Sequence, residues 1–200
     1  IKYIKSLSVE RVINLLHRWI FLLSNKQVDS VIIHEIYNNL INARIDSSPR
    51  IVIGKIDQEG SIEIRRYEDN LYAYPYTKEL ILNKDTLCSW DTFKPLTLLT
   101  GKLSAEKVLG KGLKHDKKKQ LEVRGRTGGE IIRLPGRNCS KSLKTLFQEN
   151  SILPWLRNRL PLIYINNELA AVANLWVDER FAALENEEGI ELDWVDDRFS

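Results

Sequence analysis

The sequence predicts an α+β fold made of a small helical domain with a β-hairpin, followed by a mixed α/β C-terminal domain. Three observations support this prediction. Apolar residues recur at helical spacing near the start of the chain, they then alternate with a period of two, and a second mixture of both patterns follows a lysine-rich segment. The 200 residues, 43% of them hydrophobic, are enough to bury a core. The expected domains are residues 1–76 and 118–200, joined by a linker with short strands over 77–117.

The helical domain is predicted to begin with a helix over residues 8–23, where apolar side chains recur every three or four positions behind an N-cap at Ser8. A second helix fits residues 30–43, with Ser30 as its cap. The breaker residues Asp-Ser-Ser-Pro at 46–49 end this pattern. Alternating apolar residues then predict strands over 51–53, 62–67 and 71–74, with a connection at 68–70.

The linker is predicted to carry two short apolar strands and to end in a segment rich in lysine and glycine. Such a segment is typical of an exposed connector between domains, so a boundary is expected there. The predicted strands cover residues 80–82 and 96–99, and the connector covers 111–119.

The C-terminal domain is predicted to open with a β-hairpin, because glycines separate two short apolar runs. Ser140 or Ser142 is expected to cap the helix that follows. Pro154 favours the start of a second short helix. The predicted elements are strands at 121–126 and 130–134 around a turn at 127–129, a helix at 154–160, a hairpin of 162–165 and 169–173 around Asn166-Asn167, and a strand at 190–194.

Charge is distributed unevenly along the chain, although the net charge is only +3. Residues 117–160 hold eleven Lys and Arg and three Glu, whereas residues 161–200 hold two Arg and ten Asp and Glu. One interpretation is an oriented cationic surface that binds a polyanion, with nucleic acid as the first candidate. The other is that the basic and acidic segments pair with each other in the fold, or are simply solvated.

The residues from 124 to 161 contain the candidate binding side chains, because guanidinium groups match phosphate geometry and stay charged at cellular pH. The N-terminus of the helix near Ser140 could accept a phosphate, although a capped surface helix is an equal alternative. Two arginines at alternate positions of one strand share a face, and Arg133 on the expected partner strand could join them. The candidate nucleic-acid contacts are Arg124, Arg126, Arg133, Arg137, Lys141, Lys144 and Arg157, with Arg137 and Lys141 the strongest.

Conventional catalytic and metal-binding patterns are absent from the sequence, so no catalytic residue and no metal ligand is assigned. The only histidines are His17, His34 and His115, and no HExxH, CxxC, Walker or GxSxG pattern occurs. Cys88 and Cys139 are too few for a disulfide framework, and no base is evident to activate Cys139. No apolar run approaches the ~20 residues of a membrane span, and no signal peptide is recognisable. We therefore expect a cytoplasmic protein without a membrane partner.

Several short patterns occur in a fixed order and resemble those of the bacterial tRNA(Ile)-lysidine synthase family. The front of the chain resembles its central substrate-recognition domain, through residues 11–23, 48–49 and 64–72. A later part of about eighty residues resembles its C-terminal domain. The patterns there are Gly-Gly-Glu-x-Ile-Arg-Leu-Pro-Gly-Arg at 128–137, Ser-Lys-Ser-Leu-Lys-x-Leu-Phe-Gln-Glu at 140–149, Pro-Trp-x-Arg-x-Arg-x-Pro-Leu at 154–162 and Leu-x-Ala-Val-x-x-Leu-Trp-Val at 169–177.

The resemblance implies a specific chemistry. Members of the family use ATP and Mg²⁺ to adenylate C2 of the wobble cytidine of tRNA(Ile) with anticodon CAU, and lysine then displaces AMP. The codon read changes from AUG to AUA. The resemblance also implies an N-terminal ATP-pyrophosphatase domain, a helical middle domain and a C-terminal domain that contacts the tRNA acceptor stem.

The chain departs from the family in one large respect. The nucleotide loop Ser-Gly-Gly-x-Asp-Ser is absent, because Thr127-Gly128-Gly129 lacks the Asp-Ser pair. The chain also begins at Ile1 and contains no methionine. We therefore expect a fragment that binds tRNA(Ile) but no DNA, that binds no cofactor itself, and that is inactive alone. ATP and lysine would bind the missing N-terminal domain.

Two rival interpretations remain open. The basic segment could belong to a non-enzymatic interaction module that docks on an acidic protein. Alternatively, the chain could be an appended RNA-binding domain of an aminoacyl-tRNA synthetase, although the resemblance of the front half to the lysidine synthase middle domain argues against this.

Overall fold

The computed structural model describes residues 1–44, 47–76, 78, 80–82, 87–92, 94–114 and 120–197. The chain divides into two compact units, Ile1–Glu79 and Leu80–Ser200. Helices and antiparallel sheets occur together, which confirms the predicted α+β class. His115 and most of the predicted connector lie outside the described residues, as does Asp46 of the predicted breaker.

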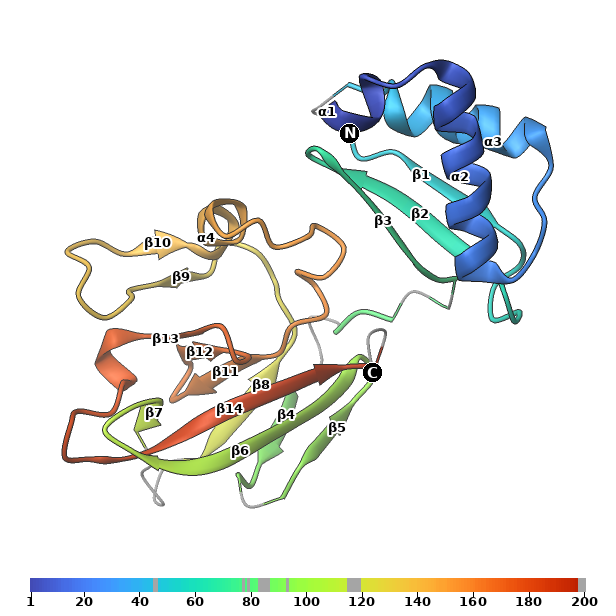
Figure 1. Ribbon diagram of the computed structural model, residues 1–200. Helices are drawn as coiled ribbons and strands as arrows, with labels where there is room; N and C mark the ends of the chain where they lie inside the picture. Colours follow the sequence, from blue (N-terminus) through green and yellow to red (C-terminus); the bar gives the residue numbers. More distant parts are fainter. Residues whose placement is uncertain are drawn as a thin grey trace. The chain divides into compact units, whose positions relative to one another are not determined.

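The first unit begins with helices that cover one face of a sheet (Figure 1). A single turn, α1 (Lys2–Lys5), precedes α2 (Val9–Ser24) and α3 (Ser30–Ile36), and the last continues as a π-helix over Tyr37–Ile41. Both long predicted helices are therefore present. The cap of α3 is Asp29, whose carboxylate accepts the N–H of Val31 at 3.0 Å, so the predicted cap at Ser30 was one residue late.

The sheet of the first unit is antiparallel, in the order β1-β2-β3. The predicted hairpin is confirmed, because β2 and β3 pair up to the last residue before a two-residue turn. The apolar faces of helices and sheet form one core, which includes Leu16, Ile20, Ile36 and Ile64. The strands are β1 (Arg50–Ile53), β2 (Ile62–Tyr67) and β3 (Asn70–Pro75).

The second unit contains two larger antiparallel sheets whose buried side chains form one core. One has the order β13-β12-β11-β8-β4 and the other β5-β6-β14-β7. The strands of the first are β4 (Leu87–Trp90), β8 (Leu121–Arg124), β11 (Leu162–Ile165), β12 (Glu168–Val172) and β13 (Trp176–Val177). Those of the second are β5 (Leu96–Leu98), β6 (Gly101–Leu109), β7 (Leu113–Lys114) and β14 (Glu188–Asp196).

The segment predicted as a linker, 77–117, supplies four of these strands, so much of it is part of the second unit. Residues 80–82 form no strand, in contrast to the prediction. The long strand β6 pairs along its whole length with β14, from Gly101 opposite Asp196 to Leu109 opposite Glu188. Gly101 permits this close approach, because a Cβ there would lie 2.1 Å from the carbonyl oxygen of Val195.

The predicted hairpin of 121–126 with 130–134 is wrong. Strand β8 pairs instead with β11 and β4, and residues 131–132 form a separate two-stranded ribbon with 141–142. The carboxylate of Glu130 accepts the N–H groups of Thr127 and Gly128, at 2.6 and 2.7 Å, and so folds the chain back locally. These side-chain hydrogen bonds therefore replace the backbone pairing of the predicted hairpin. The ribbon strands are β9 (Ile131–Ile132) and β10 (Lys141–Ser142).

Two later predictions had opposite outcomes. Residues 154–160 form successive turns with i to i+3 hydrogen bonds instead of a helix, for example from the N–H of Arg159 to the carbonyl of Leu156 at 2.9 Å. The hairpin of β11 and β12 is confirmed, with Asn166 and Asn167 at φ 50° and 63°. The last predicted strand is also present and is longer than expected.

Candidate nucleic-acid interface

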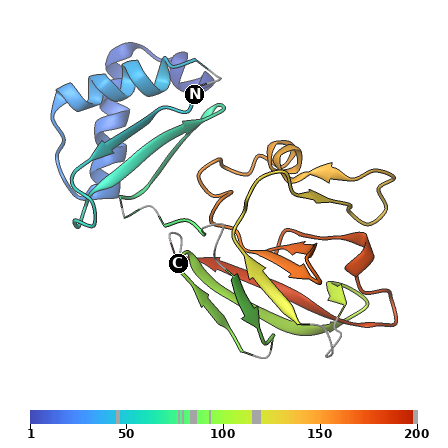
Figure 2. The same ribbon diagram turned by 180° about the vertical axis from the view of Figure 1, so that it is seen from behind.

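The most exposed basic side chains of the predicted set gather around the β9–β10 ribbon, and we call Arg133, Arg137, Lys141 and Lys144 the cationic corner. The ribbon lies beside α4 (Leu143–Glu149) in both views of the molecule (Figures 1 and 2). Buried Ile132, Leu146 and Phe147 anchor these elements in the core of the second unit, whereas every residue of the connecting loop 135–140 is exposed. The corner therefore combines Arg137 of a solvated loop with cations of the adjoining ribbon and helix, which are anchored in the core.

A single carboxylate serves two cations of the corner. The Nζ of Lys141 lies 2.5 and 2.8 Å from the two carboxylate oxygens of Glu149, and Nη1 of Arg137 lies 3.8 Å from one of them. The side chains of Arg137 and Lys141 remain 46% and 29% exposed. Lys144 is exposed and has no ion pair within the part of the chain that the structure describes. The cations therefore outnumber the carboxylates facing them.

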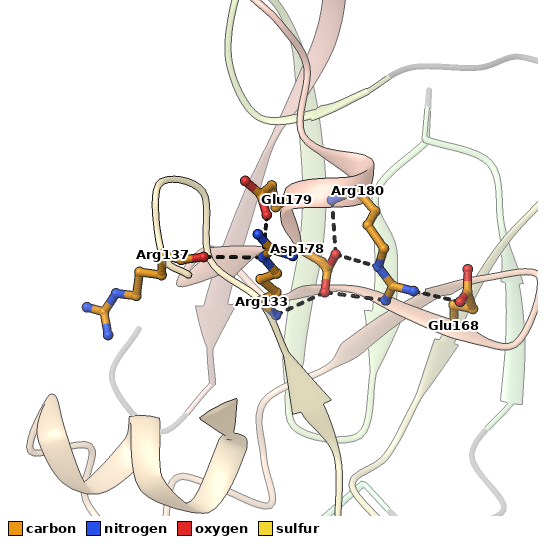
Figure 3. A network of polar contacts seen from close by, with 6 residues as sticks. All are labelled: Arg133, Arg137, Glu168, Asp178, Glu179 and Arg180. Carbon is orange, nitrogen blue, oxygen red and sulfur yellow. Dashed lines mark hydrogen bonds and ion pairs between the residues drawn. The ribbon is translucent and has the colours of Figure 1, made fainter. Parts of the chain in front are cut away.

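Both the side chain and the backbone of Arg133 make polar contacts that hold this residue in place (Figure 3). Its Nε lies 2.6 Å from Oε2 of Glu179 and donates to the carbonyl oxygen of Arg137 at 3.2 Å. Its own carbonyl accepts the N–H of Glu179 at 2.7 Å. The Arg137 side chain points away from this network (Figure 3), toward the carboxylate of Glu149. Arg133 thus helps to position the backbone that presents Arg137.

The network is centred on Asp178, which is only 1% exposed. Burial opposes ionisation of this carboxyl group, but hydrogen bonds from the Arg180 side chain and from the backbone N–H groups of Arg133 and Arg180 outweigh it. The pKa of Asp178 is therefore below its ordinary value. Arg180 also contacts Glu168 at 2.6 Å. Arg180 was not predicted from the sequence because it lies within the acidic segment, and only the side-chain contacts place it beside the corner.

Arg124 and Arg126 do not form a row with Arg133, contrary to expectation, because β8 and β9 belong to different sheets. Arg124 contacts Glu122 and Asn167, and its guanidinium lies 4.5 Å from the centre of the Tyr164 ring. These contacts use much of its hydrogen-bonding capacity inside the protein. Contact between Arg124 and RNA stays a prediction.

Arg126 and Arg157 meet at one aromatic ring. Their guanidinium carbons lie 5.3 and 6.0 Å from the centre of the buried Phe147 ring. Arg126 also faces the carboxylate of Glu130 at 3.4 Å, and Arg157 donates to the carbonyl of Ile152 at 2.8 Å. Burial opposes ionisation of Glu130, but its N–H donors prevail, so its pKa lies below the usual range. Both arginines pack the base of the corner, and their role in binding also stays a prediction.

The N-terminus of α4 is already occupied by the protein's own acceptors. The hydroxyl of Ser142 accepts the N–H of Thr145 at 3.1 Å, which confirms the predicted cap. The N–H of Leu143 donates to the carbonyl of Glu130 at 2.9 Å. The helix has only seven residues. The expected phosphate site at this helix end is therefore not supported, and the side chains of the corner remain the binding candidates.

Among the described residues, no group of three or more His, Cys, Asp or Glu side chains could hold a metal ion. No helix among the described residues is both long and apolar enough to cross a membrane. Trp155 is buried in the second unit. Trp176 packs against Phe147 with ring centres 5.5 Å apart.

In comparisons with known proteins, a segment of each unit matches a domain model of the same family. Residues 1–72 match the family model described as the TilS substrate binding domain, and residues 121–194 match the TilS substrate C-terminal domain. A tRNA(Ile)-lysidine synthase of Legionella pneumophila strain Paris is 36% identical over 185 residues, which cover 90% of this chain and 40% of that relative. Proteins of the same name from Coxiella burnetii strain RSA 493 and Buchnera aphidicola subsp. Baizongia pistaciae are 35% and 30% identical, covering 92% and 90% of this chain. The chain spans about two-fifths of the length of these curated relatives.

Proposed function

We propose that this chain, which belongs to the tRNA(Ile)-lysidine synthase family, is the portion of such an enzyme that holds tRNA(Ile). The first unit would take part in substrate recognition, and the second would hold the acceptor stem. The whole enzyme would join lysine to C2 of the wobble cytidine in the CAU anticodon, in the cytoplasm, and so change the codon read from AUG to AUA.

The proposal assigns ATP, Mg²⁺ and lysine to a domain outside this chain. The Ser-Gly-Gly-x-Asp-Ser nucleotide loop does not occur in the sequence. This chain alone would then bind tRNA without modifying it. In the proposed division of labour, the chain supplies binding energy and position, while bond formation takes place elsewhere in the enzyme.

The observation that supports the proposal most directly is the cationic corner. Arg137 and Lys141 are charged and partly exposed, and they lie next to elements that are anchored in the core. Lys144 extends the same surface. Arg and Lys side chains of this kind bind phosphate oxygens and set the register of an RNA without reading its bases. Arg133 belongs to the same group of proposed contacts. Arg124, Arg126 and Arg157 take a secondary place in the proposal, because each packs on an aromatic ring of the protein in addition to its polar partners.

The test is tRNA(Ile) binding by the full chain, measured by fluorescence anisotropy across a salt series. We expect Arg137→Ala combined with Lys141→Ala and Lys144→Ala to weaken binding and to lower the slope of log K against log salt by about 0.7–0.9 for each phosphate that is no longer bound. The matched control removes equal charge from the same unit, at Lys94, Lys102 and Lys107, and should leave the slope nearly unchanged.

Three results would contradict the proposal. The first is wild-type protein that does not bind tRNA(Ile) at low salt. The second is a corner variant that binds with the wild-type affinity and slope. The third is saturable binding to polyglutamate that is tighter than binding to tRNA, which would favour a docking module for an acidic protein instead.

A further inference from the structure

Glu179 faces one cation of the corner, Arg133, whereas Glu149 faces two. Glu149 is the last residue of α4, its side chain is 41% exposed, and its two oxygens face the Nζ of Lys141 and the guanidinium of Arg137. The carboxylates of Glu130 and Asp178 differ, because they are nearly buried and accept backbone N–H groups that hold the fold. Glu149 instead bridges two solvated cations from the exposed loop and the ribbon.

A carboxylate in this place has the chemistry of an internal phosphate substitute. Carboxylate and phosphate oxygens accept the same charge-assisted hydrogen bonds from Lys and Arg, and they compete for the same donors. Exposed ion pairs contribute little to folding stability, so the protein does not depend on this pair to keep its structure. The pair does, however, reduce the positive potential that an approaching RNA would meet.

We infer that Glu149 occupies a phosphate position of the cationic corner and that a bound RNA phosphate must displace it. This inference rests on the proposed function and adds a residue that limits binding. Because any RNA has to replace the Glu149 carboxylate, sequence-independent attraction to the corner is lowered, and an RNA needs further contacts elsewhere to bind well. Specificity that comes from a built-in opposing element is a known strategy of protein interfaces.

The experiment compares wild-type protein with Glu149→Gln in the full chain, using tRNA(Ile) and a non-cognate tRNA of similar length. The substitution keeps the shape of the side chain and removes its charge. We expect binding of both RNAs to tighten by about three- to tenfold at low salt, as Lys141 and Arg137 are released. The salt slope should become steeper by about 0.7–0.9 for each released cation that takes a phosphate.

The matched control is Glu191→Gln. Glu191 is also an exposed glutamate of the second unit, and both of its oxygens contact Lys111, at 2.8 and 3.0 Å. The Glu191→Gln substitution changes the net charge by the same amount. It should leave the RNA affinity within about twofold of the wild-type value, since long-range charge effects are screened at moderate salt. Equal tightening by both variants would overturn the inference, because net charge alone would then explain the result.

A mutant cycle tests whether Glu149 weakens RNA binding through Arg137 and Lys141. In protein that already carries Arg137→Gln and Lys141→Gln, the further change Glu149→Gln should no longer tighten binding. Tightening that persists in that background would overturn the inference. Failure of Glu149→Gln to tighten binding while wild-type protein binds tRNA would also overturn it and leave the proposed function intact. Absence of RNA binding by all variants would reject the proposed function itself.

Discussion

Two regions of the basic segment place the same kind of residue in opposite surroundings. In the turn segment 154–160, Arg159 is 3% exposed, and its guanidinium contacts both carboxylate oxygens of Asp196, at 2.5 and 2.7 Å. It also donates to the carbonyls of Leu80 and Thr100, at 2.7 and 3.2 Å. In the cationic corner, the Arg137 side chain is 46% exposed, and its carboxylate partner lies 3.8 Å away and is shared with Lys141.

The difference shows that an arginine becomes available to a ligand when the protein leaves its donors incompletely used. Arg159 has several acceptors within the fold and contributes to structure, because a buried guanidinium requires a full set of partners. Arg137 keeps most of its donors in water, and the exposed Glu149 carboxylate that it faces is not needed for the fold, so a phosphate could bind without removing a structural interaction. Three substitutions test this contrast, in order of decreasing effect.

The largest effect should follow from Arg159→Ala. The change leaves the carboxylate of Asp196 without its buried partner, and breaking such a pair costs about 3–5 kcal/mol of unfolding free energy. Urea unfolding followed by tryptophan fluorescence would measure it. Arg137→Ala is the control and should alter stability by less than about 0.5 kcal/mol. A loss at position 159 no greater than at position 137 would show that the buried pair does not hold the second unit.

A smaller effect is expected from Asp178→Asn, which removes the charge at the centre of the Arg133 and Arg180 network. Hydrogen bonds to a charged group contribute about 1.5–3 kcal/mol each, and the Asn amide retains part of this bonding, so we expect a loss of about 2 kcal/mol at pH 7. The control is Glu168→Gln, which removes only the exposed partner of Arg180 and should have little effect on stability.

The stability difference between wild-type protein and Asp178→Asn should depend on pH. The pKa of Asp178 is lowered in the folded protein, so its contribution to stability is fully present above the ordinary carboxyl pKa of about 3.9. It is lost as pH falls below that value, through the folded-state pKa. The difference in unfolding free energy between wild type and Asp178→Asn should therefore be constant from about pH 5 to 7 and shrink below about pH 4. A difference that grows in acid would contradict the assigned direction.

The smallest effect should come from Arg126→Ala, since Arg126 lies between the two extremes. Its side chain is 17% exposed, faces Glu130 and packs on the Phe147 ring. We expect stability to fall by about 1 kcal/mol, through weaker packing and hydrogen bonding. The slope of tRNA binding against salt should fall by less than the value for one phosphate, which is about 0.7–0.9. A decrease of that full value with unchanged stability would move Arg126 into the cationic corner.

Much of the local structure could be predicted from the sequence, because its signals lie within a few residues. The amphipathic spacing of α2, the Asn166-Asn167 turn and the Ser142 cap each specify an element directly. Strand pairing could not be predicted in the same way. The partner of residues 101–109 is 188–196, and hydrophobic alternation in one segment says nothing about which distant segment completes the ladder.

The candidate site was partly predictable, because a concentration of basic residues is expected to face solvent. Arg137, Lys141 and Lys144 were identified from charge and lie at the surface. Their carboxylate partner, Glu149, and the neighbouring Arg180 were not identified, because their importance depends on side-chain geometry. The positions of Arg124 and Arg126 relative to Arg133 were also mispredicted, since they depended on a hairpin that does not form.

The guanidinium of Arg159 has a consequence for protein engineering. It binds the carbonyl of Leu80, where the second unit starts, and the carboxylate of Asp196, at the last position of β14. The entry and exit segments of this unit therefore meet at one side chain. A unit whose two ends lie together can be inserted into a loop of another protein with short connections. Residues 80–197 could thus be inserted as a domain into another protein, provided that the guanidinium of Arg159, the carbonyl of Leu80 and the carboxylate of Asp196 are kept.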